Sequence, residues 1–268
     1  MNNISSTQKE TFIKIDKGDN GITTLTLNRP KSFNALSISL MSELQTALDE
    51  ITSDPKVKVI ILGGAGKAFC AGHDISEIIN NPSEKTVRTL FSKCSRLMLT
   101  LTKMPQPVIA RVHGVATAAG CQLVAQCDLA IASNEASFAT SGIGIGLFCG
   151  TPSVAVTRNL PRKQAMELLL TGEFIPPEQA LQYGLINKVV SSILLDEEID
   201  NLALKIATKG SSFISKGKQL FYSQIEDGIE KAYEKATDFM VESVKTHATQ
   251  KGLKAFIEKK DMPEWPER

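Results

Sequence analysis

Two short Gly-punctuated stretches, at 69–75 and 113–122, constrain the fold of this chain more than any other feature. Their sequences are FCAGHDI and HGVATAAGCQ, and each follows a largely apolar, β-branched run, at 57–62 and at 107–112 respectively. Each also leads into a segment that predicts a helix. Small residues leave backbone N–H groups unshielded, and the first N–H groups of a helix have no partner inside the helix. The pattern therefore predicts two sets of free N–H donors, which can hold a developing oxyanion if they converge.

Length and composition limit the class of protein. The chain has 268 residues, enough for one large domain or for one domain with an appendage. Its 42% hydrophobic and 22% charged residues are typical of soluble globular proteins. The 30 basic and 29 acidic residues give a net charge of +1, which argues against a nucleic-acid binder or a membrane-surface protein, because both usually present a basic face. No apolar run reaches the length of a membrane span.

The N-terminal segment and the cysteines favour a reduced, intracellular protein. Residues 1–11 contain neither the apolar core of a secretory signal nor the Arg residues of a mitochondrial transit peptide. We therefore expect a disordered tail over 1–10 and a cytoplasmic location. The five cysteines show no CxxC spacing and predict buried, reduced thiols. The three histidines lie far apart in the sequence, so no metal site is expected.

The hydrophobic periodicity predicts an α/β core. Apolar and polar residues alternate over 12–15 and 22–27 on either side of a Gly-rich turn, which predicts a hairpin. Helical and strand-like segments then follow in alternation: a helix at 37–51, a strand at 57–62, a helix at 86–101, and strands at 107–112 and 128–132. Strands that alternate with helices predict a parallel sheet.

The C-terminal third predicts helices. The strand pattern nearly disappears after residue 161, apart from 185–190. Three consecutive segments have a helical pattern: 201–209, 212–225 and 229–248. We therefore expect an α/β core over 11–195 and a helical C-terminal region over 196–268.

The ordered set of motifs resembles the crotonase, or enoyl-CoA hydratase/isomerase, superfamily. The set comprises NRPKSFNAL at 28–36, FCAGHDI at 69–75 and HGVATAAGCQLVAQCDLAIAS at 113–133, and the likeness continues to 255–260. The segment GLFCGTP at 146–152 looks most like a subgroup of enoyl-CoA hydratase domain-containing proteins, those of type 3. The resemblance implies a spiral core of ββα units and a helical C-terminal trimerisation region. It also implies a homotrimer or a hexamer.

The resemblance further implies an acyl-CoA thioester as substrate, no separate cofactor, and an enolate stabilised at the thioester oxygen. It places the two backbone N–H donors at His73 and Ala119. Ala119 stands where the family usually has Gly, which requires a negative φ there. The side chain of His73 is also a candidate proton carrier. Substrate or CoA binding is implied at five further positions: Lys31, Phe33, Ala71, Asp74 and Ile75.

Both acid/base positions of the family's hydratases lack an acid in this chain. The hydratases use two glutamates, and the matching positions hold Gln122 and Gly142. A Gln can orient water but cannot take its proton at neutral pH. The loss of each acid/base group is expected to slow hydration by roughly 10²–10⁴-fold. Glutamates at both positions are expected to raise the hydration rate.

Several functions remain open at this point. Enoyl-CoA hydration is the activity that the resemblance most directly implies. Isomerisation, thioester hydrolysis and decarboxylation are alternatives if another residue handles the proton. A non-catalytic acyl-CoA binder or subunit partner is an alternative from a different class of protein. The candidates for a substitute proton carrier or hydroxyl are Asp74, Glu77, Asp128, Glu135, Thr140, Ser141 and Cys149.

Overall fold

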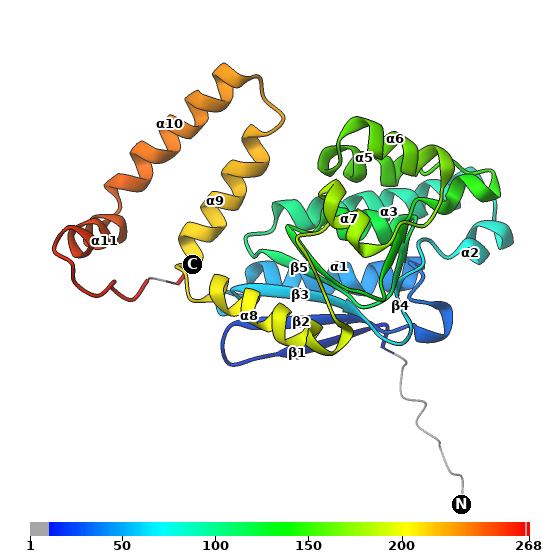
Figure 1. Ribbon diagram of the computed structural model, residues 1–268, viewed down its shortest axis with the longest axis horizontal. Helices are drawn as coiled ribbons and strands as arrows, with labels where there is room; N and C mark the ends of the chain where they lie inside the picture. Colours follow the sequence, from blue (N-terminus) through cyan, green and yellow to red (C-terminus); the bar gives the residue numbers. More distant parts are fainter. Residues whose placement is uncertain (1–10, 266) are drawn as a thin grey trace, which may run out of the picture.

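Two sheets of different size lie at the centre of the structure, a computed structural model that describes residues 11–265, 267 and 268 (Figure 1). The expected tail over 1–10 lies outside the described residues. The six-stranded sheet has the order β1 (Ile13–Lys17), β2 (Ile22–Leu27), β3 (Val59–Gly64), β5 (Val108–Val112), β7 (Leu129–Ser133) and β9 (Lys188–Val190). The three-stranded sheet has the order β4 (Ala68–Cys70), β6 (Val115–Thr117) and β8 (Ser137–Ala139).

The strands repeat a simple unit. The strand β1 pairs antiparallel with β2, which confirms the predicted hairpin, and every other pairing in both sheets is parallel. A strand of the large sheet is followed three times by a strand of the small sheet: β3 by β4, β5 by β6, and β7 by β8. Helical segments follow each pair, so the core consists of ββα units, as the family resemblance implied. The small sheet was not predicted from periodicity, because strands of three residues are too short to show an alternating pattern.

The alternation of side chains along β3 divides the interior into two layers. Ile60 and Leu62 belong to the main hydrophobic core, whereas Val59 and Ile61 belong to a second cluster on the other face of the sheet. Successive strand residues point to opposite faces, and a sheet covered on both faces needs apolar residues at every position. This arrangement explains the nearly unbroken apolar run at 57–62.

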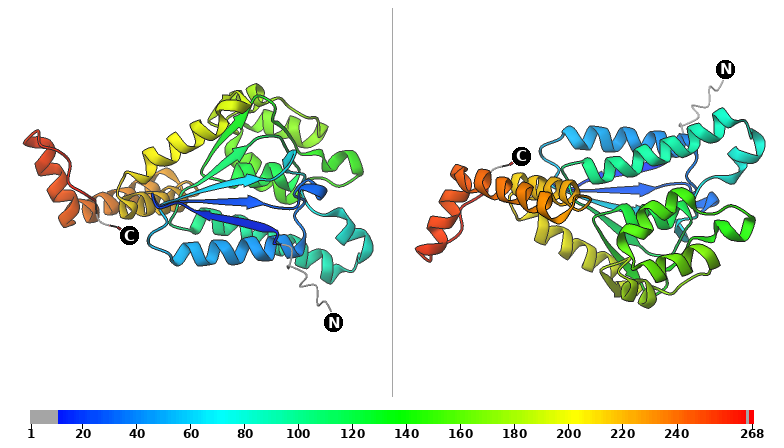
Figure 2. Two further views of the ribbon diagram at one scale, coloured as in Figure 1. Left: turned by 90° about the horizontal axis from the view of Figure 1, so that it is seen from below. Right: turned by 90° about the horizontal axis from the view of Figure 1, so that it is seen from above.

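Helices cover both faces of the large sheet. On one face lie α1 (Ile38–Ser53) and α3 (Glu84–Lys103), which pack against each other. On the opposite face lies α8 (Leu195–Ala207), and Figure 2 shows α1 and α8 on the two sides of the sheet. Shorter helices connect the strands: α2 (Ile75–Asn80), α4 (Ala119–Gln126), α5 (Gly150–Asn159), α6 (Arg162–Thr171) and α7 (Pro177–Tyr183). The helix α8 begins at residue 195, where the core was expected to end. It nevertheless packs on the core.

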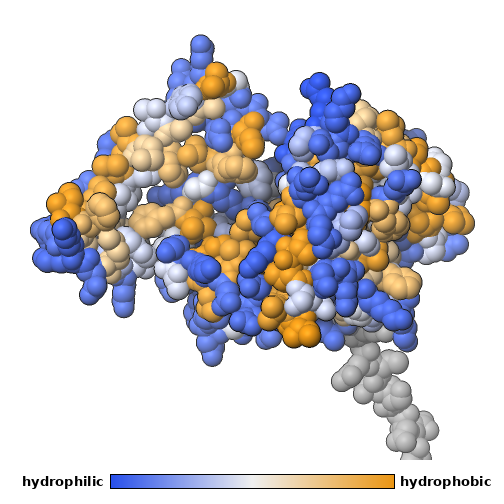
Figure 3. Space-filling model, viewed as in Figure 1, coloured by the Kyte–Doolittle hydropathy of each residue, from blue (hydrophilic) through white to orange (hydrophobic). Residues whose placement is uncertain are grey.

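Three C-terminal helices form an arm that extends from the core: α9 (Ser211–Gln224), α10 (Ile229–Lys245) and α11 (His247–Ile257) (Figure 1). α9 and α10 correspond to the helices expected at 212–225 and 229–248, whereas the segment expected at 201–209 falls on the end of α8, and α11 was not predicted as a separate helix. No residue of α10 is buried, although its sequence is amphipathic. Large side chains with apolar surface stand exposed along the arm, among them Tyr233, Met240 and Phe256. Figure 3 shows hydrophobic residues on the surface of this arm. None of the described helices has the length and hydropathy needed to cross a membrane.

A buried ion pair fastens α9 to the core. The Lys218 ammonium donates to the carbonyl oxygens of Leu101 and Gln106, at 2.7 and 2.8 Å, and to the Asp128 carboxylate at 2.7 Å. The Tyr222 hydroxyl donates to the other oxygen of Asp128 at 2.9 Å. Burial lowers the pKa of Lys218, and the charge of Asp128 opposes that shift. The buried charge is therefore fully hydrogen-bonded, which is the condition for tolerating it in the interior.

Lys218→Met is expected to lower the free energy of unfolding by about 3 kcal/mol, because the Asp128 carboxylate would lose its charged partner. Lys216→Met is the matched control, since Lys216 lies on the same helix and is exposed. Urea unfolding of the two variants measures the difference. Equal stability of both variants would contradict the role assigned to the ion pair.

Candidate functional site

Three parallel strands bring the predicted site positions to one edge of the small sheet. His73, Ala119 and Gly142 lie within three residues of the ends of β4, β6 and β8 respectively. Because the carboxyl ends of neighbouring parallel strands meet at the same edge, the segments that follow them are neighbours in space. The structure therefore gathers the two predicted N–H donors and one of the two positions without an acid.

Glycines allow the two predicted loops to touch. A Cβ atom on Gly72 would lie 2.9 Å from the Cβ of Ala118 and 3.2 Å from the backbone nitrogen of Ala119. A Cβ atom on Gly120 would lie 2.0 Å from the carbonyl oxygen of Cys70. Both gaps are too small for a side chain. The loop after β4 is thus held directly against the first turn of α4.

The backbone N–H groups of His73 and Ala119 have no hydrogen-bond acceptor among the described residues. Their neighbours do have acceptors: the N–H of Asp74 donates to Leu36 at 3.2 Å, and that of Ala118 donates to Ala139 at 2.9 Å. Ala119 is the first residue of α4, where a helix offers no acceptor of its own. Two free donors therefore stand on two loops in contact.

Ala118, just before the second donor, has a strained backbone. Its φ of 51° and ψ of −117° lie in a region that favours Gly, whereas Ala119 does not have a positive φ. Ala is therefore compatible with position 119, as expected. A conformation of this kind costs about 1–3 kcal/mol and persists only where the surroundings enforce it. Here the hydrogen bonds to Ala139 and from the Gln122 N–H hold it. Nothing in the sequence indicated this strain.

The His73 side chain is partly buried and packs against α3. Its ring meets that of Phe91 edge-on, with the centroids 5.0 Å apart, and its Nε2 is buried without a partner among the described residues. Burial lowers the pKa of His73 to about 4. The ring is therefore neutral at pH 7 and a weak base, so it is poorly suited to carry protons at that pH.

Gln122 lines a cavity of about 1090 Å³ between α3, α4, α5 and α9. The residue is only 3% exposed, and its Oε1 has the Cys94 thiol at 3.9 Å as its partner. Its amide nitrogen has no acceptor among the described residues. From Gln122 the cavity follows one face of α4, past Ala125, to Asp128. It therefore begins one helical turn from the free N–H of Ala119.

Gly142 cannot take a side chain in this backbone arrangement. A Cβ atom there would lie 2.5 Å from the carbonyl oxygen of Leu147 and 2.9 Å from the Cys149 sulfur. A Glu at this position would displace the segment at 147–149. A backbone carbonyl therefore occupies the space that a Glu at position 142 needs, whereas the gain in hydration expected from glutamates at both positions stays a prediction.

The positions expected to bind CoA lie together beside the first loop. Phe33 is 51% exposed, and its carbonyl oxygen accepts the N–H of Ala71 at 3.0 Å. Lys31 is exposed on the preceding short 3-10 helix, Pro30–Ser32, and Ile75 is partly exposed at the start of α2. The fully buried Asn34 stabilises this turn by donating to the carbonyl oxygens of Ala65, Ala68 and Phe69.

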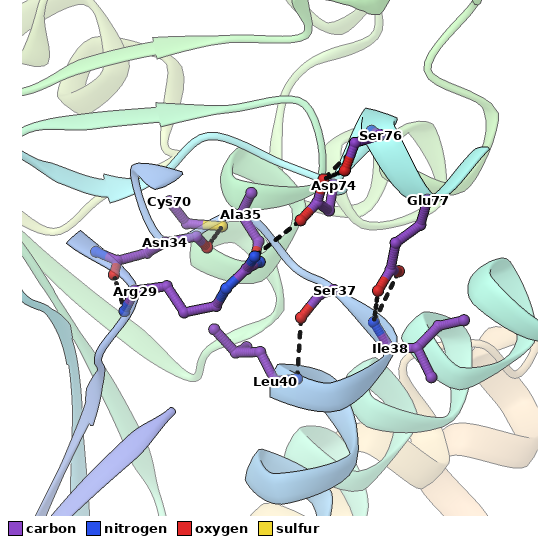
Figure 4. A network of polar contacts seen from close by, with 10 residues as sticks. All are labelled: Arg29, Asn34, Ala35, Ser37, Ile38, Leu40, Cys70, Asp74, Ser76 and Glu77. Carbon is purple, nitrogen blue, oxygen red and sulfur yellow. Dashed lines mark hydrogen bonds and ion pairs between the residues drawn. The ribbon is translucent and has the colours of Figure 1, made fainter. Parts of the chain in front are cut away.

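Asp74 and Glu77 are used in structural contacts (Figure 4). Asp74 accepts from Arg29 at 2.9 Å and caps α2 through the N–H of Ser76. Burial raises the pKa of Asp74, but the hydrogen bonds from Ser76 and Arg29 outweigh it and hold the pKa below its usual value. Both oxygens of Glu77 accept the N–H of Ile38, at 2.9 and 3.2 Å. Both carboxylates therefore take part in contacts that fix the local structure.

The remaining candidates are also engaged or hard to ionise. Asp128 is held by Lys218 and Tyr222, as described above. Glu135 accepts from Ser192, and the Thr140 hydroxyl donates to the carbonyl oxygen of Leu168. The other two have one feature each: Ser141 shares a 2.7 Å hydrogen bond with Thr117, and burial raises the pKa of Cys149. Among the described residues, no group of three His, Cys, Asp or Glu is placed to hold a metal ion.

Comparison with known proteins gives a consistent result. Residues 17–268 match the Enoyl-CoA hydratase/isomerase family. The Xenopus laevis protein named enoyl-CoA hydratase domain-containing protein 3, mitochondrial, is 41% identical over 98% of this chain and 89% of its own length. Its Homo sapiens counterpart is 41% identical over 91% of this chain and 80% of its own length. A Mycobacterium smegmatis enoyl-CoA hydratase structure is 46% identical, with a TM-score of 0.93, over 95% of this chain and 99% of the other.

The expected cytoplasmic location is wrong. The relatives of type 3 from several vertebrates carry the word mitochondrial in their names, which points to that compartment. The expectation rested on the absence of Arg from residues 1–11, and the absence of one signal does not identify a compartment. The resemblance to the type 3 subgroup is confirmed by the same relatives.

Gly120→Ala is expected to lower the free energy of unfolding by several kcal/mol, because the new methyl group would overlap the carbonyl of Cys70. Gly217→Ala, in the middle of α9 with no atom close to the new methyl group, is expected to raise it by roughly 0.5–1 kcal/mol. Thermal and urea unfolding measure both. If both substitutions changed the free energy of unfolding in the same direction, the result would contradict the close contact between the loops.

His73 is expected to make stability depend on pH. Its pKa is about 4 in the folded protein and near 6.5 when unfolded, so the unfolded state takes up the proton first as the pH falls. The stabilisation from the neutral ring, about 3 kcal/mol, is complete above pH 6.5 and is lost as the pH falls toward 4. His73→Phe removes this dependence. As the pH falls from 7.5 to 4.5, the free energy of unfolding of the parent protein is therefore expected to decrease relative to that of the His73→Phe protein. Parallel curves would show that the ring titrates normally.

Proposed function

This chain belongs to the enoyl-CoA hydratase/isomerase family, and we propose that it binds an acyl-CoA thioester with the thioester oxygen between the N–H groups of His73 and Ala119. The observation that carries this proposal is a pair of N–H groups, on two loops in contact, that have no acceptor in the part of the chain that the structure describes. Donors that are fixed before the ligand arrives stabilise negative charge on an oxygen without further reorganisation. Such a pair suits the enolate that forms when a thioester loses a proton from its α carbon.

The CoA portion is proposed to lie along the turn at 31–33 and the adjoining strand end. Lys31 would meet a phosphate as a point charge, and Phe33 and Ala71 would line the nucleotide end of the site. The hydrogen bond between the Phe33 carbonyl and the Ala71 N–H supports this, since it joins the two segments. Asp74 would contribute by fixing this turn through Arg29, and Ile75 by its partly exposed side chain.

The nominal reaction, hydration of a 2-enoyl-CoA, is proposed to be slow in this protein. Gln122 can orient a water molecule but cannot deprotonate it, and Gly142 provides no side chain. Each missing acid/base group costs roughly 10²–10⁴-fold in rate. An oxyanion site without a proton carrier therefore retains binding and loses most of the acceleration.

A non-catalytic acyl-CoA binder is the second candidate function. It is favoured by the state of the titratable groups around the two loops. Asp74 and Glu77 are held in structural contacts, His73 is a weak base, and burial raises the pKa of Cys70 and Cys94 to about 12. Isomerisation, thioester hydrolysis and decarboxylation also need a group that handles a proton or a water, so the same observation argues against fast versions of them.

The protein is proposed to assemble as a homotrimer or a hexamer through the arm. The exposed apolar side chains of α10 and α11 support this, because a monomer would leave them in water (Figure 3). Val241 and Val244 continue this apolar face of α10.

Ala119→Pro tests the proposed thioester site. Proline is tolerated at the first position of a helix and removes the one N–H in question. We expect the affinity for butyryl-CoA to fall by roughly 10-fold or more and any turnover of crotonyl-CoA to disappear. Calorimetric titration and mass spectrometry of the products measure the two effects.

Glu84→Pro is the matched control, since it places proline at the first position of α3, on an exposed site away from the loops. Circular dichroism verifies that both variants are folded. A folded Ala119→Pro protein that binds and turns over acyl-CoA like the parent would refute the assignment of this donor.

A further inference from the structure

The direction of the His73 N–H group is set by a short pairing with the turn before α1. The N–H of Leu36 donates to the carbonyl oxygen of Gly72 at 2.7 Å, and the carbonyl oxygen of Leu36 accepts the N–H of Asp74 at 3.2 Å. In a trans peptide the C=O and the N–H point in opposite directions. Because the Gly72 carbonyl points toward Leu36, the His73 N–H of the same peptide points away from Leu36.

The turn that holds Leu36 has an unusual backbone. Phe33 and Asn34 are consecutive residues with φ of 50° and 56°, in the left-handed region that favours Gly. Asn adopts this region more readily than most residues, but two such residues in succession persist only where contacts enforce them. The carbonyl oxygen of Phe33 accepts the N–H of Ala71 at 3.0 Å. The turn therefore also holds the loop two residues before His73.

The side chain of Asn34 enforces this turn. It is fully buried and uses both ends of its amide. Its Oδ1 accepts the N–H of Arg29 at 2.9 Å, which closes the turn on itself. Its Nδ2 donates to the carbonyl oxygens of Ala65, Ala68 and Phe69, at 2.9, 2.8 and 3.2 Å. The amide thus fixes the turn to β4, the strand that leads directly into the loop with the first donor.

We propose that Asn34 is the positioning residue for the His73 donor. Through the pairing of Leu36 it sets where the His73 N–H stands relative to the N–H of Ala119, and therefore how well both hold one oxygen. Asn34 is 0% exposed, so it acts through this backbone and not by touching a ligand. The role needs an amide, because an Asp of the same shape keeps the acceptor for Arg29 but has no N–H to donate to β4. This proposal rests on the thioester binding proposed above.

The test isolates the contribution of the thioester oxygen to binding. Butyryl-CoA is compared with its thioether analogue S-butyl-CoA, which lacks that oxygen, and the ratio of their dissociation constants is measured by calorimetric titration. We expect the thioester to bind roughly 10-fold more tightly in the parent protein, and this ratio to fall roughly 3- to 10-fold in Asn34→Asp and Asn34→Gly. The infrared band of an isotopically labelled thioester carbonyl is expected to move to lower frequency on binding to the parent protein, and to move less in both variants.

Gln106→Glu is the matched control for Asn34→Asp. Gln106 is also a buried amide, 1% exposed, and donates to the carbonyl oxygens of Ile51 and Asp54, at 2.7 and 3.4 Å. It precedes the start of β5, whereas the two loops follow the ends of β4 and β6. The control therefore removes similar hydrogen bonds away from the site, and we expect it to lower stability and keep the parent ratio. Circular dichroism verifies that each variant is folded.

The outcomes distinguish this proposal from the one on which it rests. A ratio near one in the parent protein would overturn the thioester site and, with it, the role of Asn34. A high parent ratio that either folded Asn34 variant retains, with an unchanged infrared band, would overturn the positioning role alone. An equal fall of the ratio in Gln106→Glu would do the same, because general loosening would then explain it. Loss of folding in both Asn34 variants would also overturn the proposal, which requires a folded protein with a displaced donor.

Discussion

The contact between Gly120 and the carbonyl of Cys70 is the constraint on which the rest of the site depends. With only 2.0 Å available for a Cβ atom, the first turn of α4 lies against the end of β4 without a side chain between them. This contact brings the free N–H groups of His73 and Ala119 to neighbouring positions. It also accounts for the strained φ of Ala118, which turns the chain from β6 into the helix within one residue. The strain is offset by the packing of the small sheet.

A second set of contacts fixes the first loop from the other side. Asn34, fully buried, ties the turn at 30–36 to three carbonyl oxygens near β4. Figure 4 shows that Arg29 joins Ala35 of this turn to Asp74. The Asp74 carboxylate, a candidate proton carrier, is used here for structure. The result is a site with rigid backbone donors and few groups able to move protons. This combination supports the proposal that the protein binds a thioester and transforms it slowly.

Much of the fold was predictable because its signals are local and periodic. The hairpin, α1, α3 and the buried strand β3 follow from runs long enough to show a period of two or 3.6 residues, or a continuous apolar character. The small sheet was not predictable in this way, because its strands are three residues long and are defined by pairing across the chain. The packing of α8 on the sheet was missed for a related reason: a helical period shows which face is apolar but not which surface that face covers.

The site, like the fold, was predictable from the sequence only in part. The glycines and the helix start marked both loops, and the family resemblance selected His73 and Ala119 within them. Three features needed coordinates: the unusual φ of Ala118, the carbonyl of Leu147 that blocks a side chain at Gly142, and the cavity lined by Gln122. Each arises from contacts between residues far apart in sequence or from a backbone angle, neither of which a residue pattern records.

The most direct test of the account is a crystal structure of the protein with butyryl-CoA bound. The account predicts that the thioester oxygen lies about 2.7–3.2 Å from the backbone nitrogens of both His73 and Ala119. It also predicts that the acyl chain enters the cavity beside Gln122. A bound butyryl-CoA whose thioester oxygen contacts neither nitrogen would contradict the central claim that these two N–H groups form the thioester site.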